Sequence, residues 1–311
     1  MASSAPCFGF SLAHLRDRQL DYFFRSCGLQ HLCFQVDPAT TMACWCKPSA
    51  AETLADQNKP AIVLIHGFAT SALWQWCEQV KPLQRNFRVF VPDLIFFGKS
   101  TTKGSSRSET FQAEMIAKAM ETMNVPSYSV VGTSYGGFVA FRLAHLFPQR
   151  VQKVVIANSG VCTTCQDEQE LLERAKLKVV EDLLLPQSVA AFRTLLCLSY
   201  NSFLRNIPSF VLQSLLQYFY VENRDLQVEL LQGLTLGKEN AEPLPTLLQK
   251  VLLIWGEHDG IFPPKMAHRL KKHLGDNAEL VFIKNVAHCA QAENPKEFNK
   301  LVEKFLLTLP S

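Results

Sequence analysis

The sequence predicts an α/β fold in which a mostly parallel, eight-stranded sheet is covered by helices on both faces. Its short apolar runs, such as residues 61–65 (AIVLI) and 251–255 (VLLIW), lack the in-out alternation of a sheet that faces water on one side. Each run ends in a turn-forming residue and is followed by a helical pattern, which is typical of parallel strands joined by helices. From residue 161 to 245 only helical periods remain, which predicts a helical insertion over the edge where strands end.

The first 31 residues are predicted to form a separate N-terminal helical segment. Residues 8–24 mix apolar and charged side chains at helical spacing, so we expect an amphipathic helix packed on its own domain. Peripheral contact of this helix with a membrane is the alternative. No apolar run reaches the roughly 18 to 20 residues that a membrane-spanning helix needs.

The strands and helices follow in a regular order. The turn signal Asp37-Pro38 separates two β-like runs, which predicts that they pair as a hairpin. Six buried runs come after them. The eight predicted strands are residues 32–36, 41–47, 61–65, 87–92, 127–132, 151–157, 251–255 and 279–283, and the predicted covering helices are 111–123, 137–147, 264–274 and 295–307.

These elements predict a core domain of residues 32–160 and 246–311 that the insertion 161–245 interrupts. The insertion is rich in leucine and aromatic side chains, most of which must pack within it. We expect two or three of the aromatic ones to line a ligand cavity. The aromatic side chains are Phe192, Tyr200, Phe203, Phe210, Tyr218, Phe219 and Tyr220, and the first five are the candidates named for the cavity.

Composition excludes several classes of function. Hydrophobic residues are 48% and charged residues 19% of the 311, which is typical of a globular protein rather than a disordered one. The net charge is only +3 and the basic residues are scattered, so no nucleic-acid partner is expected. Ten cysteines at irregular spacing do not form a disulfide or zinc framework, so we expect a cytoplasmic protein without a metal, with organelle targeting as the alternative.

The pentapeptide Gly132-Thr133-Ser134-Tyr135-Gly136 is the strongest chemical signal. It lies directly after a predicted strand and directly before a predicted helix. A G-x-S-x-G turn in this setting holds its serine in a strained conformation, clear of the sheet. Ser134 is therefore the candidate nucleophile.

A serine hydroxyl needs a base within hydrogen-bond reach and a third group to orient that base. Asp259 and His288 each follow a predicted parallel strand, so they reach the same sheet edge as Ser134. They are the candidate acid and base. Glu257 is the alternative acid, although two residues earlier in the turn it fits an exposed loop carboxylate better.

The oxygen that becomes negative during acyl transfer must meet preorganised donors, usually backbone N–H groups. The turn His66-Gly67-Phe68 follows a predicted strand, and we expect it to aim the amide of Phe68 at the site. The amide of Tyr135, next to the nucleophile, is the second predicted donor. We expect His66 itself to brace the loop.

Taken together, the chain resembles the α/β-hydrolase-fold serine hydrolases. The resemblance covers about residues 32–309 and rests on HGF after the third strand, PDLIFFGKS after the fourth, GTSYGG, WGEHDGIFP and AHCAQAENP. More narrowly, the chain is similar to plant hydrolases labelled epoxide-hydrolase-like or monoacylglycerol-lipase-like, and to bacterial carbon–carbon bond hydrolases. The resemblance implies the roles assigned above to Ser134, Asp259, His288, Phe68 and Tyr135, and makes the insertion a helical cap.

One departure bears on the reaction. Epoxide hydrolases and haloalkane dehalogenases of this family form their ester on an aspartate, and position 134 here is serine. We therefore expect a carboxylic ester hydrolase that acts on an apolar or aromatic small molecule through an acyl-Ser134 intermediate, without a cofactor. Two alternatives stay open: a carbon–carbon bond hydrolase or acyltransferase with the same three residues, and a small-molecule hormone receptor on the same fold. The oligomeric state is not predicted.

Overall fold

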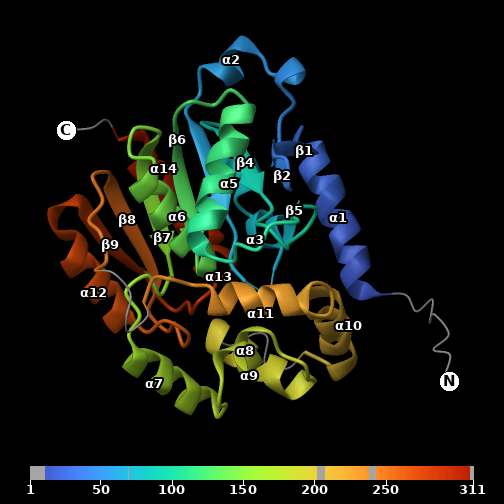
Figure 1. Cartoon of the computed structure of the whole chain (residues 1–311), viewed down its shortest axis with the longest axis vertical. Helices are drawn as coiled ribbons and strands as arrows, with labels where there is room; N and C mark the ends of the chain where they lie inside the picture. Colours follow the sequence, from blue (N-terminus) through green and yellow to red (C-terminus); the bar gives the residue numbers. More distant parts are fainter. Residues whose placement is uncertain (1–10, 69, 202–206, 238–242, 309–311) are drawn as a thin grey trace.

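The computed structural model describes residues 11–68, 70–201, 207–237 and 243–308 (Figure 1). Its centre is one nine-stranded sheet in the order β1-β2-β4-β3-β6-β7-β8-β9, with β5 paired to β2. The six strands from β4 to β9 along this order are parallel, whereas β1, β2 and β5 pair antiparallel. The strands are β1 (Gln30–Asp37), β2 (Thr40–Cys46), β3 (Ala61–Ile65), β4 (Arg88–Pro92), β5 (Thr101–Thr102), β6 (Tyr128–Thr133), β7 (Val151–Ala157), β8 (Lys250–Gly256) and β9 (Ala278–Ile283).

The predicted α/β class and mostly parallel sheet are confirmed, with one strand more than expected. All eight predicted strands form, within a few residues of their predicted bounds. The additional strand β5 is only two residues long and pairs with the start of β2. A strand so short has no hydrophobic pattern of its own, so the sequence gives no sign of it.

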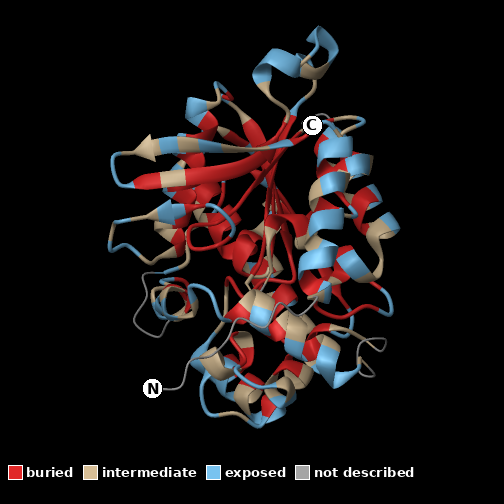
Figure 2. Cartoon of the chain, turned by 90° about the vertical axis from the view of Figure 1, so that its right-hand side faces the viewer, coloured by how far each residue is buried: buried red, intermediate tan, exposed pale blue. Residues whose placement is uncertain are grey.

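The strand β3 shows why both faces of the sheet are covered. All five of its residues are buried. Val63 and Ile65 belong to one apolar cluster and Ile62 and Leu64 to another, because successive side chains point to opposite faces. Figure 2 accordingly shows buried residues concentrated on the strands and exposed ones on the outer sides of the helices.

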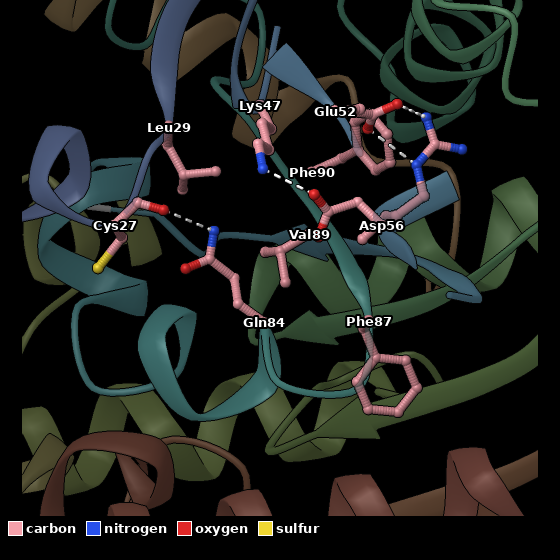
Figure 3. Close-up of a pocket in the computed structure, with 10 residues that line it drawn as sticks. Cys27, Leu29, Lys47, Glu52, Asp56, Gln84, Phe87, Val89 and Phe90 are labelled. Carbon is pink, nitrogen blue, oxygen red and sulfur yellow. Dashed lines mark hydrogen bonds and ion pairs between the residues drawn. The ribbon is translucent and has the colours of Figure 1, made fainter. Parts of the chain in front are cut away.

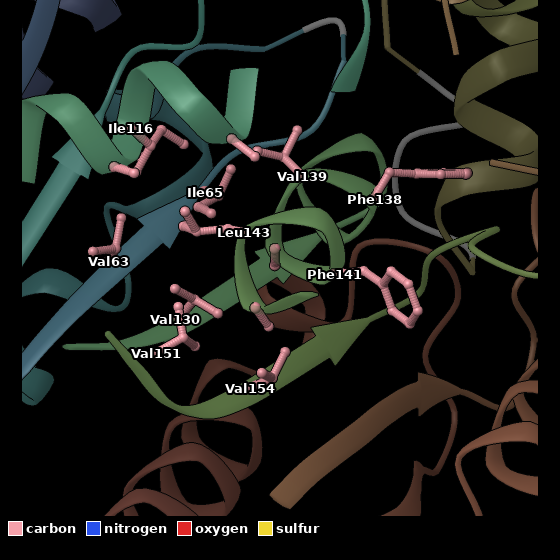
Figure 4. Packing of buried hydrophobic residues seen from close by; sticks show 14 of the residues in the cluster. Val63, Ile65, Ile116, Val130, Phe138, Val139, Phe141, Leu143, Val151 and Val154 are labelled. Atoms are coloured by element: carbon pink, nitrogen blue, oxygen red, sulfur yellow. The ribbon is translucent and has the colours of Figure 1, made fainter. Parts of the chain in front are cut away.

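Each face of the sheet has its own set of helices. On one face, Val63 and Ile65 pack with residues of α5 and α6, such as Ile116, Val139 and Leu143 (Figure 4). On the other face, α1, α3, α4 and α14 contribute to the cluster around Ile62 and Leu64. The helices outside the insertion are α1 (Leu12–Ser26), η1 (Ser49–Ala51), α2 (Leu54–Gln57), α3 (Ala72–Trp76), α4 (Val80–Leu83), α5 (Glu109–Thr122), α6 (Tyr135–Leu146), α12 (Pro264–Leu274), η3 (Gly275–Asn277), α13 (Ala290–Glu293) and α14 (Pro295–Leu307).

Between β7 and β8 every regular element among the described residues is a helix. These elements, called the helical insertion from here on, gather at one end of the sheet in Figure 1. They share an apolar cluster of their own that includes Leu183, Leu212 and Leu216. The insertion consists of α7 (Cys165–Ala175), α8 (Val180–Leu184), α9 (Val189–Ser199), α10 (Ser209–Tyr220) and α11 (Arg224–Gln232).

The N-terminal helix α1 joins the sheet domain to the insertion. Its carboxylate Asp17 accepts a hydrogen bond of 3.2 Å from Trp74 Nε1 of α3. The Tyr218 hydroxyl of α10 also hydrogen-bonds to Asp17, and Ser11 bonds to Ser214 across 3.1 Å. None of the described helices is both long and apolar enough to cross a membrane.

Candidate active site

Ser134 occupies a strained turn between β6 and α6. Its backbone has φ 54° and ψ −122°, a conformation that residues other than glycine rarely adopt. Two hydrogen bonds hold this backbone: Ser134 N donates to Ala157 O over 3.0 Å, and Ser159 Oγ donates to Ser134 O over 2.7 Å. The side chain makes no cap for α6, so its hydroxyl is not consumed by the helix.

The two glycines of the turn are required by close backbone approach. A Cβ on Gly136 would lie 2.2 Å from Ile65 O and 2.6 Å from His66 O. One on Gly132 would lie 2.1 Å from Gly136 O. Real Cβ atoms do not approach a carbonyl oxygen so closely, and a backbone between packed strands has little freedom to shift. The two glycines of the G-x-S-x-G pattern are thus also required by the packing of the turn against its neighbours.

We expect Gly136→Ala to lower the free energy of unfolding by roughly 3 kcal/mol or more, because the methyl group overpacks β3. Chemical denaturation of the purified variant measures this change. Gly104→Ala is the matched control, since its Cβ would meet only Thr102 Oγ1 at 3.3 Å. Equal stability of the two variants would contradict the close approach of the turn to β3.

Asp259 is buried at the end of β8 and accepts hydrogen bonds from four groups. Asp259 is only 3% exposed. Its Oδ1 accepts from the backbone amides of Ile261 and Phe262, both at 2.9 Å. Its Oδ2 accepts from Asn158 Nδ2 at 2.7 Å and lies 3.0 Å from His288 Nδ1. A carboxylate with so many donors is held in one orientation.

His288 follows β9 and turns one ring nitrogen to this carboxylate. Because both Asp259 oxygens lie within 3.2 Å of Nδ1, that nitrogen carries the hydrogen and Nε2 is left as the basic nitrogen of the neutral ring. Among the described residues, neither Nε2 nor the Ser134 hydroxyl has a hydrogen-bond partner. Both residues line the same cavity. The structure therefore brings all three predicted residues to one edge of the sheet.

Asn158 is the site residue that sequence reasoning missed. It follows β7 in a left-handed conformation with φ 47°, is fully buried, and donates from Nδ2 to Asp259. Its own Oδ1 is buried without a partner. The sequence offered one clue, which is that Asn158 ends a parallel strand at the edge shared by Asp259 and Ser134. Only the fold shows that an amide 101 positions away meets that acid.

Glu257, the alternative candidate for the acid, lies outside the cavity beside Ser134. Glu257 is exposed, and its Oε2 accepts from the backbone amide of Asn285 at 3.2 Å. The neighbouring His258 is exposed as well. Neither of these two side chains lines the cavity beside Ser134.

The two residues predicted to donate backbone hydrogen bonds adjoin Ser134: Phe68 lines both cavities with it, and Tyr135 follows it in the chain. Tyr135 is the first residue of α6, where an N–H has no acceptor within the helix. Neither amide donates a hydrogen bond to any described residue, so both remain available to a ligand. His66 braces the Phe68 turn as predicted: its Nδ1 bonds to Gly67 O over 2.8 Å, its Nε2 accepts from Leu94 N over 3.0 Å, and burial lowers its pKa.

Two cavities meet at Ser134. One has a volume of about 310 Å³ and is lined by His288, so we call it the histidine-side cavity. The other has a volume of about 280 Å³, is lined by Tyr135 but not by His288, and is called the opposite cavity. Ser134, Phe68, Leu184 and Ile261 line both. Most of the wall in each is apolar.

The aromatic side chains of the insertion divide in a way that the sequence did not predict. Phe192 and Tyr200 line the histidine-side cavity. Tyr218 lines neither cavity and instead packs on α1 and Trp74, whereas Phe210 is 69% exposed and lines neither. Phe203 lies outside the described residues. Phe219 and Tyr220, from the same set of aromatic side chains, line the histidine-side cavity.

A third cavity, of about 150 Å³, lies at the opposite edge of the sheet, beside the start of β4 (Figure 3). Its charged side chains already neutralise one another. Lys47 Nζ lies 2.7 Å from Asp56 and holds the pKa of that carboxyl well below its usual range. Arg88 makes a bidentate pair with Glu52 at 2.9 Å for each bond. Among the described residues that line this cavity, no charged side chain is left unpaired to recognise a ligand.

The thiols near the site offer no second nucleophile or metal centre. Cys289 adjoins His288 and lines the histidine-side cavity, but burial raises the pKa of its thiol to about 12, so it remains neutral. Among the described residues, no group of three or more His, Cys, Asp or Glu side chains is placed to hold a metal ion.

Comparison with known proteins identifies the family of the chain. A pimeloyl-[acyl-carrier protein] methyl ester esterase of Pectobacterium carotovorum is 28% identical over 254 residues, which are 78% of this chain and 93% of that protein. A pyrrolizixenacetamide deacetylase of Xenorhabdus hominickii is 24% identical over 258 residues, 81% of this chain and 93% of that one. Among solved structures, the 2-hydroxy-6-oxo-6-phenylhexa-2,4-dienoate hydrolase of Rhodococcus sp. strain RHA1 superimposes with a TM-score of 0.73 at 22% identity, covering 90% of this chain and 99% of its own. The sequence profile of the alpha/beta hydrolase fold matches residues 60–295, and the chain belongs to that family.

Proposed function

We propose that the protein is a serine hydrolase that cleaves carboxylic esters of neutral, apolar or aromatic small molecules through an acyl-Ser134 intermediate. The observation that carries the proposal is the buried pair of Asp259 and His288, whose ring lines one cavity with a serine on a strained turn. An oriented neutral imidazole beside a serine hydroxyl is the combination that activates a poor nucleophile.

In this proposal His288 Nε2 takes the proton of Ser134 as the serine oxygen attacks the ester carbonyl. The carbonyl oxygen becomes negative and accepts hydrogen bonds from the amides of Phe68 and Tyr135. When the tetrahedral intermediate collapses, the bond to the alcohol oxygen breaks and His288 returns the proton to that oxygen. A water molecule, activated by the same ring, then hydrolyses the acyl-serine, which releases the acid and restores Ser134.

The two cavities support an ester with an apolar group on each side of its carbonyl. Because His288 must reach the leaving oxygen and lines only the histidine-side cavity, we assign the alcohol to that cavity. The acyl group then occupies the opposite cavity. Each has a volume suited to a group of small-molecule size.

The linings favour a neutral substrate over an anionic one. Among the described residues, neither cavity is lined by arginine or lysine. The opposite cavity is lined by Glu168, Glu181 and Asp167, the last of which is paired with Lys265 and Arg269. A ring-fission product such as a dienoate carries a carboxylate, for which the described lining of these cavities offers no arginine or lysine partner. Ester hydrolysis is therefore the better candidate than carbon–carbon bond cleavage.

A fluorophosphonate probe together with a panel of neutral esters tests the proposal. We expect covalent labelling of Ser134, located by peptide mass spectrometry, and release of acid and alcohol from the neutral esters. Matched esters with a carboxylate on the acyl chain should react more slowly. Labelling without turnover on any ester, together with ligand-dependent thermal stabilisation, would favour a receptor; transfer to an added alcohol in preference to water would favour an acyltransferase. Absence of labelling would overturn the nucleophile assignment.

A further inference from the structure

The outward face of α1 carries a stripe of large apolar side chains that remain partly exposed in the described structure. Leu12, Leu15 and Tyr22 are 41%, 40% and 75% exposed. Together with Gln19 they recur at spacings of three, four and three residues, so they follow one face of the helix. Exposed large apolar side chains occur singly elsewhere, as at Leu54 of α2, but here they form a line.

The charged side chains that flank this stripe are positive. Arg16 flanks it on one side and Arg18 on the other, both are exposed, and neither forms an ion pair with a described residue. The two acids of α1 point away from the stripe. Asp17 is bound to Trp74, and Asp21 is paired with Arg25 at 2.6 Å. The stripe therefore presents apolar side chains between free cationic groups.

The residues before α1 continue this chemistry in the sequence. Residues 1–10 (MASSAPCFGF) include Phe8 and Phe10 and carry no charged side chain. An uncharged segment with two phenylalanines, followed by a helix with an apolar stripe between arginines, suits the boundary between lipid headgroups and acyl chains. There arginine can meet phosphate while leucine and aromatic rings enter the apolar layer.

We propose that the outward face of α1 (Leu12, Leu15, Arg16, Arg18 and Tyr22) binds the surface of an anionic phospholipid membrane. The inner face of the same helix contacts Trp74, which lines the histidine-side cavity. Docking through α1 therefore places that cavity beside the lipid surface, where apolar esters accumulate. Membrane binding itself does not depend on the proposed ester chemistry, so the two ideas fail separately.

Co-sedimentation of the full chain with sucrose-loaded vesicles tests this inference. One vesicle population consists of equal parts of phosphatidylcholine and phosphatidylglycerol, and the other of phosphatidylcholine alone. We expect binding to the mixed vesicles, weaker binding to the neutral ones, and a decline as sodium chloride is raised, because salt screens the arginine–phosphate attraction.

Two variants separate the apolar and the charged contributions. L12E/L15E should lower the fraction bound to mixed vesicles by about tenfold or more, and R16Q/R18Q should remove most of the preference for them over neutral vesicles. The matched controls are L54E in α2 and K272Q in α12, two exposed positions away from α1, which should bind like the unaltered protein. Circular dichroism melts establish that each variant is folded.

Three results would overturn the inference. The first is failure of the unaltered protein to bind mixed vesicles. The second is binding by both altered α1 variants at the level of the controls. The third is a dimer in size-exclusion chromatography that L12E/L15E dissociates while vesicle binding is absent, since the stripe would then be covered by a second copy of the chain.

Discussion

Ser134→Ala is expected to lower kcat on every ester that the protein hydrolyses by about 10³-fold or more, and to abolish fluorophosphonate labelling. The hydroxyl is the only part of the side chain that is removed. The turn itself is held by backbone hydrogen bonds to Ala157 and by Ser159, so the fold should persist. Initial rates over a range of ester concentrations, with a thermal melt of the same sample, measure both expectations.

Ser105→Ala is the matched control for this variant, because Ser105 is exposed and lies outside the candidate site. It should hydrolyse esters at the unaltered rate. Retention of most activity by Ser134→Ala on every ester tested would show that another group is the nucleophile. The proposed acyl-enzyme would then be abandoned, whereas the family assignment would stand on the fold.

Asp259→Asn is expected to lower kcat/KM by roughly 10³-fold to 10⁴-fold, although only one oxygen is replaced by nitrogen. The amides of Ile261 and Phe262 require an oxygen at Oδ1, so the new NH₂ group takes the place of Oδ2. There it faces His288 Nδ1 as a donor. The ring must then accept at Nδ1 and carry its hydrogen on Nε2, where it can no longer take the proton of Ser134.

The same NH₂ group would also oppose the NH₂ of Asn158, which now donates to Oδ2 over 2.7 Å. We therefore expect some loss of stability beside the loss of rate, and a chemical denaturation curve separates the two. Glu257→Gln is the control that addresses the alternative acid, because it makes the equivalent change two residues away. If Glu257→Gln lost the activity and Asp259→Asn kept it, the two assignments would be exchanged.

The strands were predictable because parallel, doubly covered strands leave a strong local signal. Runs such as AIVLI of β3 need both faces buried, and the structure buries all five residues. The boundaries of the helices were harder to predict than the strands. The glycine at 137 suggested the start of α6 there, but the helix begins at Tyr135 because the strained φ of Ser134 ends the strand abruptly. Local sequence does not specify how a strained residue sets the first turn after it.

Side-chain neighbours across the fold were much harder to predict. Tyr218 and Phe219 are adjacent, yet Tyr218 packs on α1 and Phe219 lines the cavity, because the orientation of α10 between α1 and the site decides which face turns inward. The meeting of Asn158 with Asp259 likewise depends on the pairing of β7 with β8. The catalytic roles of Ser134, Asp259 and His288 stay predictions, although the structure brings these residues together as the sequence suggested.

The contact between Asp17 and Trp74 has a consequence for how substrate preference is compared among relatives. The family profile begins at residue 60, whereas the carboxylate that fixes Trp74 lies at residue 17. Alignments trimmed to the shared region therefore omit a side chain that braces the wall of the histidine-side cavity. Two proteins with identical reacting groups can therefore differ in the rigidity of that wall, because a helix equivalent to α1 lies outside the aligned region.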